Sequence, residues 1–328
     1  SNNWIHQYPE GEWIEVEMDL FNLTSTGLVI TNSDYVQVRF NFVSDDEFNN
    51  YAGWYIDNFV ICDPNDQTTI VENPSSGRIP SSDINSTNNT NSSAINVFRF
   101  NITDQASGDG LPTMVNTFII QNEGSGTADW TDHIAGAELW HNGSIIHDLD
   151  VQITDNNLTF DKTTGTFDIA DGASEEITMK IWLNTSNIVD NSTMVFEVPA
   201  ASHNFSALET GSEFADPFPG DVTSNTFTIL VVATELLFTG QPSSIATSGV
   251  ALTTQPIVAA TDVNGNTDLN ISSLVTLSNT GGLTMANNSM NFVSGIADFN
   301  TPANFMFSSG GKYVFLNATA PGLSTTAP

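Results

Sequence analysis

The sequence predicts an all-β protein built from tandem antiparallel β-sandwich domains, and three observations support this fold class. Short runs of alternating apolar and polar residues, rich in β-branched and aromatic side chains, recur along the chain, as in antiparallel strands with one wet face. Clusters of Gly, Asp and Asn separate these runs, and no segment shows a convincing helical periodicity. The chain has 328 residues, enough for about two or three domains that each bury a core.

The composition is typical of an exported β-rich protein and excludes some partners. Charged residues make up only 13% of the chain, and the net charge of −32 comes from 38 acids against six bases. A field of this sign repels nucleic acids and anionic lipids and favours cations, so no nucleic-acid partner is expected. No apolar run approaches the ~18 residues that a membrane helix needs, so no membrane insertion is expected either.

The single cysteine, Cys62, excludes a disulfide within the chain. Stability must therefore come from sheet hydrogen bonds, core packing or a bound metal. The beginning at Ser1 and the end at Pro328 are interpreted as cuts in a longer chain.

The first 72 residues alternate as strands but are too few for a whole domain. Their strand-like runs are EWIEVEMDLF, YVQVRFNFVS and GWYIDNFVI. About four strands would make half of a jelly roll, so residues 1–72 are predicted to be the C-terminal part of a jelly-roll domain. Residues 73–94 are poor in apolar side chains and rich in Pro, Ser and Asn, which predicts a linker.

Two further sandwiches are predicted, over residues 95–233 and 234–328. Asn225–Phe238 is an apolar run without Gly, Pro or charge before Glu235, so we expect the last strand of one domain to continue directly into the first strand of the next. In the second of these domains, the run VAATDVNGNTD predicts a hairpin turn at Asn-Gly. The strand candidates of the first are NVFRFNIT, TMVNTFIIQN, AGAELWHN, SIIHDLDVQI, EITMKIWLN, TMVFEVP and NTFTILVV.

The run from Asn96 onward resembles an Ig-like β-sandwich repeat region of very large surface proteins of Bacteroidota that leave the cell by the type nine route. The likeness lies in FNITDQASGDGLPT, ADWTDHIAGAELW, IADGASEEITMKIWLNTS and FPGDVTSNTFTILVVATELLFTGQPSS. In residues 1–72, VRFNFVSDDEF and GWYIDNFVI resemble a jelly-roll module of the MAM or carbohydrate-binding sort. These resemblances imply an extracellular, secreted multidomain adhesin or appendage protein with Ig-like sandwiches.

Two acidic groups are candidate Ca²⁺ sites, because carboxylate oxygens are the ligands that this cation prefers. The first is Asp45, Asp46 and Glu47 with Asp57; in jelly rolls of the kind that this segment resembles, an acid at the position of Asp57 helps to hold calcium. The alternative is a solvated acidic loop. The second group is the pair Asp104 and Asp109, for which a Gly-rich turn is the alternative.

Two other polar groups are interpreted as ordinary structure. The spacing Asp262, Asn264, Asn266, Asp268 imitates the odd positions of an EF-hand loop but lacks the acid at the twelfth position and lies between strands, so a hairpin is predicted. The histidines 133, 141 and 147 are spaced too loosely for a transition-metal site and are expected on the surface.

Aromatic residues in the jelly-roll half suggest a second kind of ligand. Tyr51, Trp54 and Tyr55 would stack on sugar rings if exposed, whereas buried they would fill a core. Trp130, Trp140 and Trp182 are expected in a sandwich core. The sequence contains no HExxH, GxSxG, Walker or paired-Cys motif, so no enzymatic activity is expected.

The expected function is that of a structural and adhesive segment of a large extracellular surface protein or fibrous appendage. Such a segment would associate with copies of itself as a homo-oligomer or filament and mediate attachment to cells or surfaces, with cell-surface glycans as candidate partners and Ca²⁺ as the candidate cofactor. The alternative is a carbohydrate-binding accessory region of a secreted multidomain enzyme.

Overall fold

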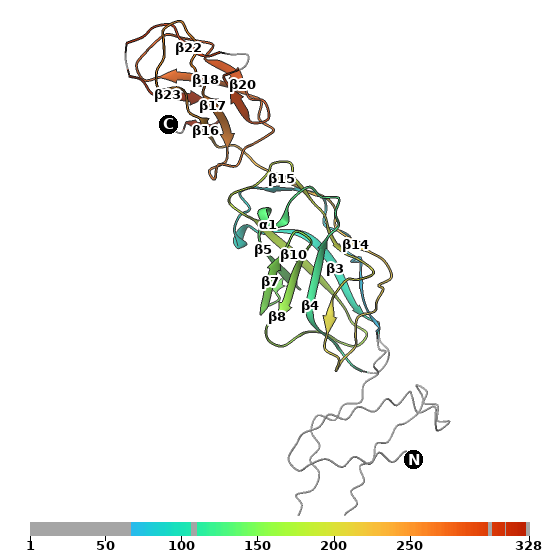
Figure 1. Cartoon of the computed structure of the whole chain (residues 1–328). Coiled ribbons are helices and arrows are strands. Elements are labelled where there is room, and N and C mark those ends of the chain that lie inside the picture. The colour runs from blue at the N-terminus through green and yellow to red at the C-terminus, as the bar shows by residue number, and fades with distance from the viewer. Residues whose placement is uncertain (1–66, 106–109, 301–303, 312, 326–328) are drawn as a thin grey trace, which may run out of the picture. The chain divides into compact units, whose positions relative to one another are not determined.

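The computed structural model describes residues 67–105, 110–300, 304–311 and 313–325 (Figure 1). All of them belong to one compact unit, residues 60–328. Within it the chain is almost entirely β, as predicted, and the strands surround two separate hydrophobic cores. We call residues 69–231 with the first core the first sandwich, and residues 234–325 with the second core the second sandwich.

The first sandwich consists mainly of two large sheets. The five-stranded sheet has the order β1-β3-β10-β5-β6, and the larger sheet has the order β14-β12-β4-β8-β7, with β13 and β9 also pairing with β4. A small sheet, β11-β15-β2, completes it. The elements are β1 (Thr69–Glu72), β2 (Asp83–Asn85), η2 (Asn91–Ser93), β3 (Ile95–Asp104), β4 (Thr113–Asn122), α1 (Trp130–His133), β5 (Ile134–His141), β6 (Ser144–Ile145), β7 (Leu149–Ile153), β8 (Asn157–Lys162), β9 (Phe167–Ile169), β10 (Ser174–Leu183), β11 (Thr193–Met194), β12 (Phe196–Val198), β13 (Ser206–Ala207), β14 (Val222–Thr223) and β15 (Phe227–Leu230).

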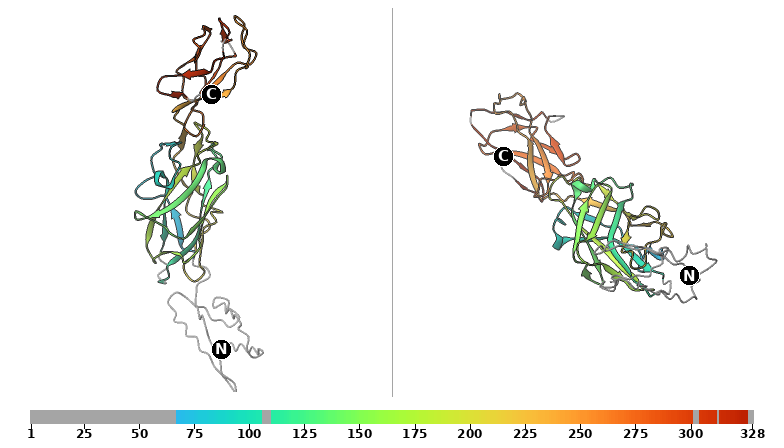
Figure 2. Two further views of the ribbon diagram at one scale, coloured as in Figure 1. Left: turned by 90° about the vertical axis from the view of Figure 1, so that its left-hand side faces the viewer. Right: turned by 60° about the horizontal axis from the view of Figure 1, so that its bottom comes forward.

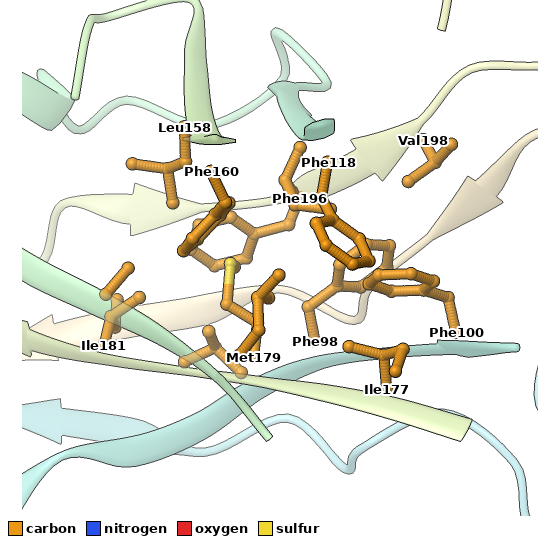
Figure 3. Close-up of a cluster of buried hydrophobic side chains, with 14 of the residues drawn as sticks. Phe98, Phe100, Phe118, Leu158, Phe160, Ile177, Met179, Ile181, Phe196 and Val198 are labelled. Atoms are coloured by element: carbon orange, nitrogen blue, oxygen red, sulfur yellow. The ribbon is translucent and has the colours of Figure 1, made fainter. Parts of the chain in front are cut away.

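Alternation along the strands builds the first core. In β10, Ile177, Met179 and Ile181 are fully buried while the residues between them are half-exposed, because successive side chains of a strand point to opposite faces. Figure 3 shows these side chains meeting Phe118 of β4 and Phe160 of β8 between the two sheets. The strand β8, which contributes to this core, was not among the predicted strands.

The prediction of a linker over residues 73–94 is wrong for part of this range. It contains β2, and Ile84 of β2 is fully buried in the first core. The strand pairs in parallel with β15, with Ile84 opposite Ile229. The expected boundary at residue 72 is also displaced, because β1 pairs with β3 in the first sandwich. The burial of Ile84 and the pairing of β2 with β15 thus place part of this segment in the first sandwich, although its composition is polar.

The second sandwich is smaller and follows the first with almost no spacer. The predicted continuous strand over Asn225–Phe238 is divided into β15 and β16, with residues 231–234 between them. The sheets of the second sandwich have the orders β21-β17-β16-β24, β20-β18-β23 and β19-β22. The strands are β16 (Glu235–Gly240), β17 (Ile257–Thr261), β18 (Leu274–Asn279), β19 (Met285–Ala286), β20 (Ser289–Asn291), β21 (Ile296–Asp298), β22 (Met306–Phe307), β23 (Leu316–Thr319) and β24 (Ser324–Thr325). Figure 2 gives two further views of the same elements.

Candidate functional site at the junction of the two sandwiches

The loop after β10 is anchored to the first sandwich through a buried histidine. His133, only 3% exposed, ends the short helix α1, which Asp129 caps by accepting from the Asp132 N–H. Its Nδ1 donates to the Asp129 carbonyl at 2.6 Å, and its Nε2 accepts from the Val189 N–H at 3.1 Å. The His133 carbonyl also accepts from the Asn184 N–H at 2.9 Å. The loop over residues 184–191 is therefore held to His133 at Asn184 and at Val189.

Asp190, on this loop, bonds both to the connection between the sandwiches and to the second sandwich. The side chain is 3% exposed. Its Oδ1 accepts from the Val231 N–H at 2.8 Å, and its Oδ2 accepts from the Leu269 N–H and from Asn270 Nδ2, both at 2.9 Å. A buried carboxylate with these three donors is compensated without a cation, because hydrogen bonds to a charged acceptor are the strong ones.

The predicted hairpin of the second sandwich supplies a second contact. Asp262 N–H donates to the Asn266 carbonyl at 2.9 Å, and Gly265 turns the chain with a φ of 85°, as expected for an Asn-Gly turn. The Asp262 carboxylate accepts from the Asn266 side chain and so orients it. Asn266 then accepts from the Ile188 N–H at 3.1 Å and donates to the Thr185 carbonyl at 2.9 Å.

Two further contacts complete the junction. Asn191 and Asn270 exchange side-chain amide hydrogen bonds of 3.1 and 3.2 Å. Asp268 Oδ2 accepts from the Ala233 N–H at 3.1 Å, which ties the connecting residues to the second sandwich. We call Asp190, Asn191, Asn266, Asp268 and Asn270 the clasp. Its donors are amides and its acceptors are carboxylates and carbonyls. The clasp therefore joins the two sandwiches through hydrogen bonds alone.

Most of the sequence-predicted site residues lie outside the described part of the chain. These are Asp45, Asp46, Glu47, Asp57, Asp109, Tyr51, Trp54 and Tyr55. Asp104 is described: it is 1% exposed, and its Oδ2 accepts from the Thr113 hydroxyl at 2.8 Å. Its pairing with Asp109 in a calcium site stays a prediction. Over the ranges that the structure covers, no three His, Cys, Asp or Glu side chains are grouped as metal ligands.

The three histidines lie in separate environments. His133 is buried at the junction, whereas His141 Nε2 contacts Glu175 Oε2 at 2.6 Å and His147 is exposed. The expectation of surface histidines is therefore wrong for His133. The expectation of a core position is confirmed for Trp130, which is fully buried, and wrong for Trp140 and Trp182, which are half-exposed on an outer sheet face.

Sequence reasoning missed the clasp. The EF-hand-like spacing at residues 262–268 marked one half of it, because Asp and Asn in a tight turn supply oriented acceptors and donors. Nothing local marked Asp190, which stands in the ordinary run VDNST. Its role depends on Val231 and Leu269, which are distant in sequence.

Comparison with known proteins yields distant likenesses only. No family model matches the chain, and no curated protein matches it. Similar solved structures include β-glucuronidase 3 of Bacteroides uniformis, at 11% identity and a TM-score of 0.23, over 60% of this chain and 21% of that one. The major pilin subunit BcpA of Bacillus cereus has 10% identity and a TM-score of 0.25, over 77% of this chain and 59% of the pilin.

A third likeness is to the C-terminal domain of the AgI/II polypeptide BspA of Streptococcus agalactiae. The identity is 8% and the TM-score 0.25, over 79% of this chain and 96% of that domain. The chain thus spans 21% of the glucuronidase, and likenesses at this distance define no family. In the part of the chain that the structure describes, no helix is long and apolar enough to cross a membrane.

Proposed function

We propose that this chain is a structural and adhesive segment of a large extracellular surface protein or fibrous appendage. The observation that supports this most is the clasp, in which Asp190 and Asn266, 3% and 6% exposed, join loops of the two sandwiches. A flexible tether would leave such groups in water. Burying them is favourable only if the loops stay together, since an unpaired buried acceptor costs ~1–3 kcal/mol. A junction of this kind suits a load-bearing spacer.

The surface of the second sandwich supports a role in self-association. It carries only four acids and one base, so charge repulsion between copies is weak there. Large apolar side chains are nevertheless exposed on it, among them Ile245 at 81%, Val263 at 75% and Val293 at 71%. Covering these side chains with a second protein surface would remove apolar area from water. The proposed partner is a second copy of the chain, in a homo-oligomer or filament.

The remaining features of the proposal follow from sequence. A composition with 13% charged residues favours an extracellular location, and the resemblance to Bacteroidota repeats favours export by the type nine route. Calcium at Asp45, Asp46, Glu47 and Asp57 would screen the net charge of −32. The proposal includes no catalytic role.

Replacing Asp190 tests the clasp. In an Asp190→Ala variant the N–H groups of Val231 and Leu269 lose their acceptor, so the free energy of opening at the junction should fall by ~1–3 kcal/mol. Hydrogen exchange followed by mass spectrometry would show faster exchange in peptides covering these two amides, and small-angle scattering would show a broader range of distances.

The matched control is Asp150→Ala, which removes an exposed carboxylate from β7 of the first sandwich. It should leave both measurements unchanged. If Asp190→Ala exchanges and scatters like the unmodified chain, the clasp does not hold the junction and the spacer role loses its support.

A further inference from the structure

Two tryptophans lie on the outer face of the five-stranded sheet of the first sandwich. Trp182 and Lys180 of β10 stand opposite Gly136 and Glu138 of β5, and Trp140 of β5 belongs to the same face. The neighbours of Trp182 along β10, Ile181 and Leu183, are fully buried, and so is Leu139 beside Trp140 in β5. Both indoles are half-exposed. This face therefore carries large aromatic surface that the core does not use.

The indole ring of Trp182 packs directly against Gly136. A Cβ atom at position 136 would lie 2.1 Å from Trp182 Cζ2 and 2.6 Å from two further atoms of the same ring. The indole thus covers the α-carbon of Gly136, and only glycine permits this approach. One face of the ring rests on the backbone of β5, so its other face is turned away from the sheet.

The same ring lines a cavity of about 260 Å³ at the edge of β5. The other walls come from β5, from β6, from the segment between β6 and β7 and from β7 itself, and they combine apolar residues with polar ones. The polar lining residues are Glu138, His147 and Asp148. An aromatic side chain together with a few polar residues is the usual lining of a small-ligand site.

The Trp140 side chain, unlike that of Trp182, makes two polar contacts within the protein. Lys180 Nζ lies 3.4 Å from the centroid of the Trp140 ring, in a cation–π contact. The Trp140 indole N–H donates to Glu138 Oε2 at 2.9 Å. Its ring face and its donor are therefore both used within the protein, which leaves Trp182 as the available stacking surface.

We propose that Trp182 and the adjoining cavity form a binding site for an uncharged saccharide. The C–H face of a pyranose ring stacks on an aromatic ring. The Asp148 carboxylate is the acceptor for a sugar hydroxyl, because the two oxygens of Glu138 already accept from Asn91 Nδ2 and from the Trp140 indole N–H. Glu138 and Asp148 disfavour uronic and sialic acids, because like charges repel. This site is separate from Tyr51, Trp54 and Tyr55, and it does not depend on the structural role proposed above.

The test is calorimetric titration of the whole 328-residue chain with neutral oligosaccharides. The probes are the hexasaccharides of β-1,4-glucose, α-1,4-glucose, β-1,4-mannose and β-1,4-xylose, and oligogalacturonate serves as the acidic probe. At least one neutral probe should bind, and oligogalacturonate should not. Trp182→Ala should weaken binding about tenfold or more.

Two further variants distinguish a binding site from a ring that merely covers a glycine. Trp140→Ala, from the same face, should change the affinity by less than about twofold, because Lys180 occupies that ring. Gly136→Ala should weaken binding while the melting temperature shows the chain still folded, since the added methyl displaces the Trp182 ring. Absence of binding to all four neutral probes, or equal binding by Trp182→Ala and the unmodified chain, would overturn the proposal.

Discussion

At the scale of single residues, His203 lies in surroundings that disfavour its protonated form. It is 6% exposed and stacks on Phe218, with ring centroids 3.8 Å apart. Its Nε2 donates to the Ala215 carbonyl at 3.0 Å, and its Nδ1 accepts from the Phe205 N–H at 3.0 Å. Burial lowers the pKa of His203 below its ordinary 6.5, against the smaller opposing effects of Ala215 and the Asp216 charge.

This pKa shift predicts a loss of stability in mild acid. Because the folded pKa lies below the unfolded value, the unfolded chain binds more protons as the pH falls below about 6.5, and the free energy of unfolding falls with it. Protonation of Nδ1 would also remove the acceptor of the Phe205 N–H. The measurement is urea unfolding between pH 7.5 and 5.5.

The control for this prediction is His203→Gln, which has no titrating group at that position. The unmodified chain should lose more stability than the variant across the same range. Subtracting the two curves cancels other groups, such as Glu197, whose pKa is raised by burial and by nearby carboxylates. Parallel curves for the two proteins would show that His203 does not contribute.

At the scale of elements, a three-residue strand closes one side of the first sandwich. The strand β2 lies in a segment of Pro, Ser and Asn, and its single inward side chain, Ile84, is fully buried. The strand pairs in parallel with β15, and parallel pairing requires a long crossover connection. The strand β2, near the beginning of the first sandwich, and β15, its last strand, are thus held together, although most of the domain lies between them in sequence.

Truncating Ile84 should therefore destabilise the first sandwich strongly. Ile84→Ala removes fully buried methyl groups and leaves a cavity, for which we expect a loss of ~2–5 kcal/mol in the free energy of unfolding. Ser81→Ala, at an exposed position of the same segment, should change it by less than ~0.5 kcal/mol. Urea unfolding followed by circular dichroism measures both. Similar small effects of the two substitutions would mean that β2 can detach without cost.

At the scale of the whole molecule, charge is distributed unevenly along the chain. The net charge is −32, yet residues 234–328 contribute only four acids and one base. Long-range repulsion between copies therefore comes from residues before the second sandwich. Salt shortens its range from ~30 Å at 0.01 M to ~10 Å at 0.1 M, which should allow the exposed apolar side chains of the second sandwich to meet.

Sedimentation velocity should accordingly show self-association that increases with salt. We expect the weight-average sedimentation coefficient to rise between 0.01 M and 0.1 M NaCl, and to rise further in CaCl₂ at the same ionic strength if carboxylates bind the ion. Equal sedimentation coefficients in NaCl and CaCl₂ would contradict calcium binding but would not contradict self-association. A chain that stays monomeric in every condition would contradict the proposed self-association.

The sequence by itself determined the features that depend on neighbours along the chain. Alternation placed a strand over residues 113–122, where β4 lies, and located β3, β5 and β10 within two residues at each end. The Asn264-Gly265 pair predicted the turn that the structure contains. These features depend on side-chain alternation and on the conformational freedom of glycine, and both act over a few residues.

Only the tertiary structure decided which polar segments are buried and which aromatic residues are not. Asp190 is buried because Leu269 and Asn270 of the other sandwich supply its donors, and Ile84 is buried because β15 pairs with its strand. Trp182 lies on the outside of its sheet, because its position in β10 faces away from the core. Each outcome depends on a partner distant in sequence, and burial and pairing energies exceed local preference.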